Sequence, residues 1–172
     1  MIKRAGISRR TFYDNFANRA DAFRFAYDDA FEQYLACVDR AASAVKSWPL
    51  RIAAGVAVTV SLVARKPAQA RLVLVDSLGV SLDLAAHHRR SLDRLIPFIA
   101  EGRRQPTAPS AMPMTLEQAL IGGASTLLAA RLESGAEPSL PGLELELLEF
   151  ILTPYLGPDA ARRVSAAQAR VR

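Results

Sequence analysis

The chain has 172 residues and a formal net charge of +5, with 51% hydrophobic but only 7% aromatic residues. This suits one globular domain, or one domain with a small appended module, whose core is mainly Leu, Ala, Val and Ile. No run of about 18 apolar residues occurs and the first residues lack an apolar signal region, so we expect neither a membrane span nor export. The lone cysteine, Cys37, excludes an internal disulfide and a thiolate-rich zinc site, and a cytoplasmic location is expected.

Positive charge is concentrated near the N-terminus. Residues 1–20 carry five basic side chains against one acidic side chain, Asp14, whereas the other 152 residues carry 17 basic and 16 acidic ones. A basic end on a nearly neutral body is typical of a protein that meets a polyanion at that end. A solvated, charged terminus would have the same composition, so charge alone leaves both interpretations open.

The apolar spacing is helical throughout, and the expected fold class is all-α. Ser8 can cap a short helix over about 8–16, and Asn18 can cap a long helix over about 19–46. Apolar residues recur along the long helix at steps of three or four, which predicts one continuous buried stripe. These residues are Phe23, Tyr27, Phe31, Tyr34, Val38, Ala41 and Val45.

Prolines, serines and glycines divide the rest of the chain. We expect helices over about 48–65 and 67–80, a helical segment reaching about 101, a loop over 102–114, and helices over about 115–133 and 140–155. Ser81 or Ser91 can cap the middle segment, and Pro97 should bend or split it. A last helix starts at Pro158 and is expected to fray after Arg163, leaving a disordered tail after about 164.

The short helix over 8–16 has the side chains of a DNA-reading element. At about 100° per residue, Phe12 and Phe16 share one face and can anchor the helix. The other faces carry Arg9, Arg10, Thr11, Tyr13, Asp14 and Asn15. Arginine can donate two hydrogen bonds to guanine or phosphate, hydroxyls suit phosphate oxygens, and asparagine can pair with adenine. Arg19 can meet a phosphate together with the free amides at the start of the long helix.

Residues 5–19 read Ala-Gly-Ile-Ser-Arg-Arg-Thr-Phe-Tyr-Asp-Asn-Phe-Ala-Asn-Arg. They resemble the second half of the helix-turn-helix of TetR-family transcriptional regulators, where Ala-Gly-Val-Ser-x-x-Thr-Phe-Tyr-x-x-Phe-x-x-Lys spans the turn, the recognition helix and the start of helix four. Ile7 and Arg19 replace the usual valine and lysine. So dense a match is more specific than a lone short motif. The resemblance implies core positions for Phe12 and Phe16. It implies DNA contacts for Arg9, Arg10, Thr11, Tyr13, Asn15 and Arg19.

The rest of the chain resembles this family in architecture only. The resemblance implies a partial helix-turn-helix module over 1–26, with the recognition helix at about 8–16, and an all-helical ligand-binding and dimerisation domain over 27–172. The family's module has three helices and this chain starts inside the second. Two interpretations follow: a longer protein begins upstream of Met1, which we favour, or the product is an N-terminally truncated ligand-binding dimer unable to bind DNA.

Helices rich in Leu, Val and Ala can enclose a pocket for an apolar or amphipathic small molecule, although the same residues can simply fill a core. Candidate polar groups near such a pocket are Tyr27, Trp48, Asp76, His87 and His88. The two adjacent histidines diverge by about 100° on a helix, so at most one faces inward and no shared metal is expected.

Two late segments predict a homodimer. Gly122-Gly123 inside a helix favours a close helix–helix approach, and 143–156 is apolar on more than one side. We therefore expect pairing through about 115–134 and 140–156, with Leu148 in the interface.

No phosphate-binding glycine loop, paired metal-ligand motif or nucleophile elbow occurs, and Cys37 lies near the apolar stripe as a thiol expected to be inert. We therefore expect no enzyme activity, no metal and no cofactor. The sequence predicts a TetR-like regulator, most simply a repressor that a small molecule releases from a palindromic operator on double-stranded DNA.

Overall fold

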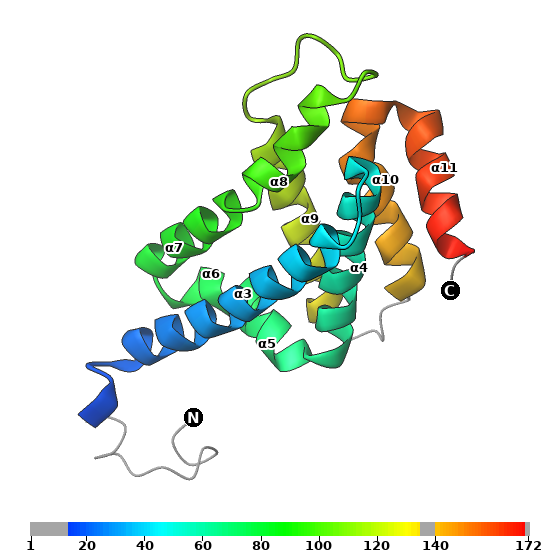
Figure 1. The fold of residues 1–172 in the computed structure, drawn as a ribbon. Coiled ribbons are helices and arrows are strands. Elements are labelled where there is room, and N and C mark those ends of the chain that lie inside the picture. Colours follow the sequence, from blue (N-terminus) through cyan, green and yellow to red (C-terminus); the bar gives the residue numbers. More distant parts are fainter. Residues whose placement is uncertain (1–13, 135–139, 171–172) are drawn as a thin grey trace.

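The computed structural model describes residues 14–134 and 140–170, and the regular structure in these ranges is helical throughout (Figure 1). The all-α fold class is therefore confirmed for this part of the chain. The elements are α3 (Arg19–Ser43), α4 (Trp48–Arg65), α5 (Pro67–Arg71), the π-helical turn η1 (Leu72–Asp76), α6 (Ser77–Val80), α7 (Leu82–Asp93), α8 (Ile96–Ala100), the 3-10 turn η2 (Glu101–Arg104), α9 (Leu116–Glu133), α10 (Leu140–Leu156) and α11 (Pro158–Ala169).

Helix α3 begins where the sequence predicts. Asn18 Oδ1 accepts a hydrogen bond from the amide of Asp21 at 2.9 Å, and the Asp21 carboxylate in turn accepts from the amide of Ala17 at 3.1 Å. These bonds satisfy amides that have no partner inside the helix. The helix ends at Ser43, slightly earlier than expected, because Ser47 takes an extended backbone and 44–47 form the turn into α4.

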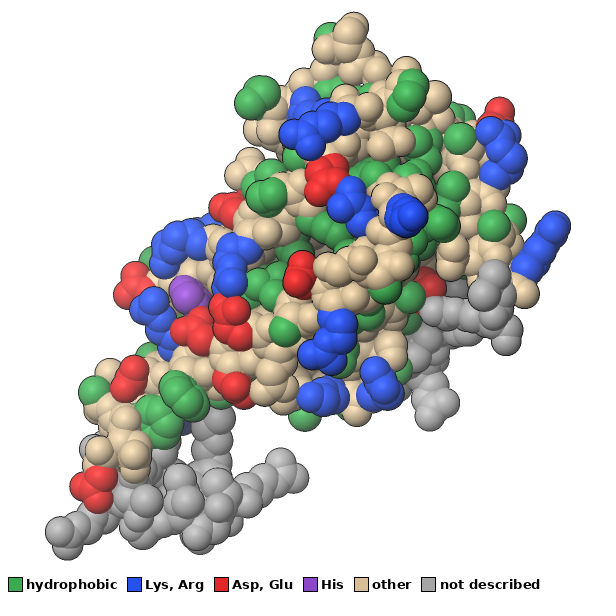
Figure 2. All heavy atoms as spheres, in the orientation of Figure 1, with side chains coloured by type: hydrophobic (Ala, Val, Ile, Leu, Met, Phe, Trp, Pro, Cys, Tyr) green, Lys and Arg blue, Asp and Glu red, His purple; other side chains and the backbone are tan. Residues whose placement is uncertain are grey.

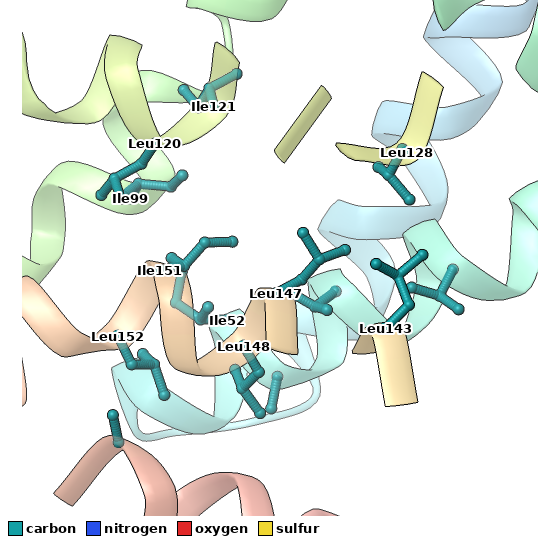
Figure 3. Packing of buried hydrophobic residues seen from close by; sticks show 14 of the residues in the cluster. Ile52, Ile99, Leu120, Ile121, Leu128, Leu143, Leu147, Leu148, Ile151 and Leu152 are labelled. Carbon is teal, nitrogen blue, oxygen red and sulfur yellow. The ribbon is translucent and has the colours of Figure 1, made fainter. Parts of the chain in front are cut away.

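Helix α4 is the centre of the main core, in contact with α3, α10 and α11. Its buried residues recur at steps of three or four, and Figure 3 shows one of them, Ile52, in the same cluster as Leu147 and Ile151 of α10. Within the described residues α4 is also a helix long and apolar enough, by length and composition alone, to cross a membrane. Its contacts on several sides are those of a core helix.

The middle of the chain follows the predicted breaks with two additions, one of which is the 3-10 turn η2 at the start of the predicted loop over 102–114. Residues 67–80 are helical as expected, but η1 interrupts them with a wider π turn that the sequence did not indicate. Ser81 caps α7 by accepting a hydrogen bond from the amide of Leu84 at 3.2 Å. The helix breaks after Asp93, and Pro97 then lies in the first turn of α8, where its missing amide costs little.

The C-terminal helix is longer than predicted. Helix α11 continues to Ala169 instead of fraying after Arg163, and 165–169 do not form a disordered tail. Ala161 and Ser165, one helical turn apart, are buried, and Val164 packs against the main core. Helix α11 lies against α10 (Figure 1). The packing of these few small residues therefore keeps 165–169 helical, although most of the side chains of α11 are polar or small.

A buried ion pair joins η2, α9 and α10. Arg103 donates from Nε and Nη2 to the two carboxylate oxygens of Glu117 at 2.7 and 2.8 Å, and Tyr155 donates its hydroxyl proton to Glu117 Oε1 at 2.8 Å. Arg103 also donates to the carbonyl oxygen of Pro113 at 2.7 Å, which fixes the end of the loop before α9. The Arg103 hydrogen bonds hold the pKa of Glu117 below its usual value although the carboxylate is buried.

Candidate DNA-contact and ligand-binding sites

The described part of the predicted DNA-contacting segment is its last turn and the start of α3. Asn15 is exposed, and so is Arg19 in the first turn of α3. Phe16 is half-buried, and the centroid of its ring lies 5.8 Å from that of Phe25, whose side chain is 65% exposed. This end of α3 projects away from the bundle (Figure 1). The other predicted residues lie outside the described ranges: Arg9, Arg10, Thr11, Phe12 and Tyr13.

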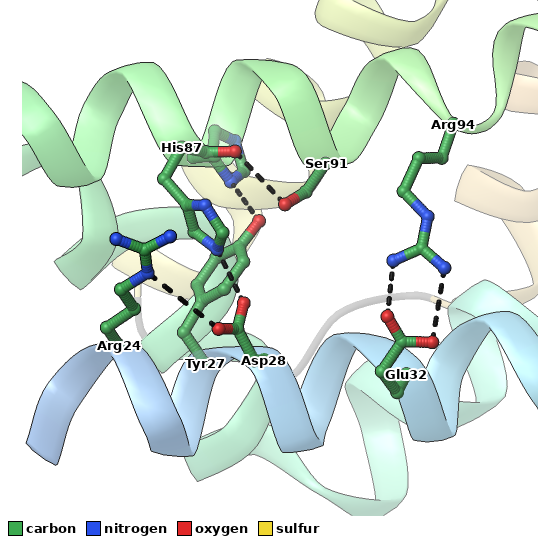
Figure 4. A network of polar contacts seen from close by, with 8 residues as sticks. Arg24, Tyr27, Asp28, Glu32, His87, Ser91 and Arg94 are labelled. Carbon is green, nitrogen blue, oxygen red and sulfur yellow. Dashed lines mark hydrogen bonds and ion pairs between the residues drawn. The ribbon is translucent and has the colours of Figure 1, made fainter.

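The N-terminal half of α3 is joined to α7 by a buried polar contact. The hydroxyl of Tyr27 hydrogen-bonds Nδ1 of His88 at 3.0 Å, and both side chains are buried (Figure 4). Burial raises the pKa of Tyr27 to about 12 and lowers the pKa of His88, because the charged form of each group loses its hydration. Both groups are therefore neutral at pH 7. Phe23, Phe31 and Leu84 surround this contact as a second, smaller apolar cluster.

Further polar pairs join α3 and α7 beside this contact, as Figure 4 shows. His87 Nε2 lies 2.5 Å from Asp28 Oδ1, and Arg94 donates to both carboxylate oxygens of Glu32. The Arg94 hydrogen bonds lower the pKa of Glu32. The guanidinium of Arg94 also lies 5.9 Å from the centre of the Phe31 ring. The α3–α7 network, which we define as these pairs together with Tyr27 and His88, therefore extends from Tyr27 to Glu32, about one and a half turns of α3.

A pocket of about 380 Å³ adjoins the C-terminal half of α3. This volume is toward the low end of the range for small-molecule sites, roughly 300–1,000 Å³. Its walls come from α3, α4, the segment over 69–74, the α7–α8 region, α9 and α10, and they are predominantly apolar. Figure 2 shows hydrophobic side chains in the recess between α3 and α8. Representative wall residues are Phe31, Val56, Phe98, Leu128 and Ile151.

The polar groups of the pocket are few. The hydroxyl of Tyr34 lies 3.2 Å from Thr59 Oγ1, and Thr59 donates to the carbonyl oxygen of Gly55 at 2.8 Å. Burial raises the pKa of Tyr34, which stays neutral at pH 7. Ser125 also lines the pocket, and its hydroxyl has no hydrogen-bond partner among the described residues. The arrangement suits a mostly apolar molecule that makes a small number of hydrogen bonds.

None of the five residues predicted to supply polar groups to the pocket is among those that line it. Tyr27, His87 and His88 belong to the α3–α7 network. Trp48 is buried at the start of α4, where its indole N–H donates to the carbonyl oxygen of Phe98 at 3.1 Å and its ring packs edge-on against Tyr155. Asp76 is exposed, and its Oδ1 lies 3.7 Å from Nε of Arg71.

The two adjacent histidines were expected to diverge; His88 is buried, but the His87 side chain is only 16% exposed and its ring centroid lies 5.3 Å from that of Tyr27, so both lie against α3. Sequence reasoning missed Tyr34 and Thr59 as pocket residues, although Tyr34 was on the predicted buried stripe. The available signal was the small residues Ala30 on α3, Gly55 on α4 and Ala124 on α9, which leave the space that larger side chains would fill.

The outer face of α9 and α10 carries exposed apolar side chains. Leu127 is 47% exposed and Phe150 is 40% exposed, beside a shallow hollow. The hollow is lined by Leu116, Ala119, Leu120, Phe150, Thr153 and Pro154. A Cβ at Gly123 would lie 3.0 Å from Phe150, so this glycine permits close packing inside one protomer, whereas Gly122 faces open space. Leu148 is 1% exposed in the core, which corrects its predicted place in an interface.

Among the described residues no group of three His, Cys, Asp or Glu side chains is placed to hold a metal ion. Comparisons with family models, with curated proteins and with solved structures found no match. The function must therefore be argued from the motif, the pocket and the helix that joins them.

Proposed function

We propose that this chain is a ligand-responsive DNA-binding regulator of the TetR type, most simply a repressor that acts as a homodimer. One observation carries the proposal: a single helix, α3, presents the exposed Arg19 next to the DNA-binding motif at one end and lines the apolar pocket at the other. Whatever tilts this helix at the pocket also moves Arg19.

The continuity of α3 supports this link. The helix runs for 25 residues without an internal glycine or proline, and its first turn is capped by Asn18. A ligand can change DNA affinity only if it binds the two positions of α3 with different affinity. The pocket provides for this, since Phe31, Tyr34, Cys37 and Val38 of α3 form part of its wall.

The outer face of α9 and α10 supports a two-fold dimer. Exposed apolar side chains on two adjacent helices are typical of a surface that a partner covers, and Phe150 and Leu127 are such side chains. A homodimer would present two reading helices, as required for half-sites about 34 Å apart in successive major grooves.

The DNA-binding part is tested by presenting the full chain with a pool of random duplexes, enriching the bound fraction and measuring affinity by fluorescence anisotropy. If a dimer meets about six phosphates, log affinity falls with log salt at a slope near −5. Arg19→Ala should weaken binding and flatten the slope. The matched variant Arg163→Ala, another exposed arginine on α11, should change neither.

A flat salt response, or no enriched duplex, would contradict the regulator and leave the ligand-binding dimer as the function of this chain. The dimer is tested separately by sedimentation velocity. Phe150→Glu should give monomers, while Leu82→Glu, at an 89% exposed site on α7, should leave the dimer intact. A dimer that survives Phe150→Glu would exclude this face.

A further inference from the structure

We propose that the pocket takes an amphipathic anion, a carboxylate with an apolar body of fatty-acid type, and that Lys66 and Arg40 receive its head group. The inference deepens the proposed function and rests on it, because it takes the pocket as the effector site. The apolar walls do not indicate whether the ligand is charged, so the inference is based on the charged residues that line the pocket.

The sign of the charge around the pocket is uniform. Of the residues that line it, the charged ones are Arg40 and Lys66, and no aspartate or glutamate is among them. Both cations are exposed, whereas most of the other lining residues are apolar. An apolar cavity lined by two exposed cations and no anion matches a molecule that has an apolar body and one anionic end.

Neither cation is committed to a carboxylate of the protein. Elsewhere in the described residues several exposed basic groups pair with acids, as Arg94 does with Glu32 and Arg71 with Asp76. Arg40 and Lys66 make no such ion pair in this part of the chain. Lys66 Nζ instead lies 3.4 Å from Oε1 of Gln33, a pocket residue of α3, so the ammonium reaches across the gap between α4 and α3.

The interior of the pocket favours an acyl chain over a more polar body. Thr59 uses its proton on the carbonyl oxygen of Gly55, and the Tyr34 hydroxyl lies within hydrogen-bond distance of Thr59. Thr59 Oγ1 therefore accepts from Tyr34 and donates to the backbone, and Ser125, Gln33 and Gln69 are the further uncharged polar residues of a lining that is mostly aliphatic or aromatic. A ligand rich in hydrogen-bonding groups would lose its hydration there without finding enough partners.

Isothermal titration calorimetry on the full chain without DNA tests the inference, with decanoate as the probe and decan-1-ol as its uncharged counterpart. We expect decanoate to bind once per protomer and more tightly than decan-1-ol. Lys66→Gln and Arg40→Gln should each weaken decanoate binding by about fivefold, the size of one exposed ion pair, and leave decan-1-ol unchanged. Arg65→Gln, at an exposed neighbouring cation that does not line the pocket, is the matched control.

Equal affinity for the acid and the alcohol would overturn the inference, as would decanoate binding that is insensitive to both lysine and arginine variants. Ser125→Leu, which places a larger side chain on the pocket wall, should weaken both probes if they occupy this pocket, and unchanged binding would also overturn the inference. The calorimetry contains no DNA, so it tests the ligand class separately from the proposed function. A second measurement adds decanoate to the chain bound to an enriched duplex. If decanoate binds in the calorimeter but does not release the duplex, the ligand class stands and the proposed function is contradicted.

Discussion

Two polar networks brace this helical bundle, and they differ in how water reaches them. The pair of Arg103 and Glu117, completed by Tyr155, has a carboxylate that is 3% exposed and joins η2, α9 and α10. In the α3–α7 network the buried contact is between neutral Tyr27 and His88, and the ion pair of Arg94 and Glu32 beside it is exposed.

The difference indicates which part of the fold can move. Opening the buried pair would leave a carboxylate without partners in the core, which is costly. Exposed ion pairs contribute little each, because water replaces the lost partner. The region around α9 and α10 is therefore held firmly, whereas the N-terminal half of α3 is held by one buried hydrogen bond, a small apolar cluster and several weak pairs.

The largest expected effect is at the buried pair. Glu117→Ala should lower the free energy of unfolding by about 3 kcal/mol, because Arg103 and Tyr155 lose their acceptor. Urea denaturation measures this change. Glu133→Ala, at an exposed position of the same helix, should stay within about 0.5 kcal/mol of the unmodified chain, and a similar loss in both variants would refute the special role of Glu117.

Tyr27→Phe should have the next largest effect, about 1.5 kcal/mol in the same measurement, because buried His88 loses its hydrogen-bond partner. Tyr34→Phe is the matched variant: Thr59 keeps its bond to Gly55, so a loss of only about 0.5 kcal/mol is expected. If the two variants were equally destabilised, the buried contact of α3 with α7 would not be the stronger of the two.

Acid should weaken the α3–α7 network before it affects the buried pair. Burial lowers the pKa of His88 below 6.5, so the unfolded chain binds this proton more readily than the folded one. The contribution of neutral His88 to the free energy of unfolding is therefore complete above pH 6.5. It decreases as the pH falls from 6.5 toward the pKa of His88 in the folded chain. The lowered pKa of Glu117 acts in the separate range below 4.5. The measurement is the melting temperature as a function of pH. His88→Asn should remove the decrease in melting temperature that begins below pH 6.5, and His87→Asn should retain it.

The smallest effect is expected at the exposed pair. Glu32→Gln should lower the melting temperature only slightly, and the difference should vanish in high salt, since screening already weakens this contact. A large loss that persists in high salt would mean that the pair of Glu32 and Arg94 is a main support of α3.

The sequence predicted the helices well because their ends carry local chemical signals. Asn18 and Ser81 cap the helices that follow them, and the break before Pro97 is where proline chemistry places it. The end of α11 could not be predicted in this way. Its stability depends on small residues such as Ala161 and Ser165 fitting against α10, a contact between helices that composition does not record.

The candidate site was predicted less well than the fold. A periodic pattern shows that Tyr27 and Tyr34 face inward from α3, but it does not show that one meets a histidine and the other a cavity. That distinction depends on which residues of other helices are small, and in which direction each helix crosses its neighbour. The partnership of Glu117 with Arg103 likewise crosses a loop and has no local signal.

The uninterrupted length of α3 has a mechanical consequence. From Tyr34 at the pocket to Arg19 the helix spans about 22 Å at 1.5 Å per residue, so a pivot of about 5° at the pocket displaces Arg19 by about 2 Å. That distance is comparable to the difference between a formed and a broken hydrogen bond to a phosphate. In the proposed regulator, a small rearrangement at the pocket would therefore be enough to break a phosphate contact of Arg19.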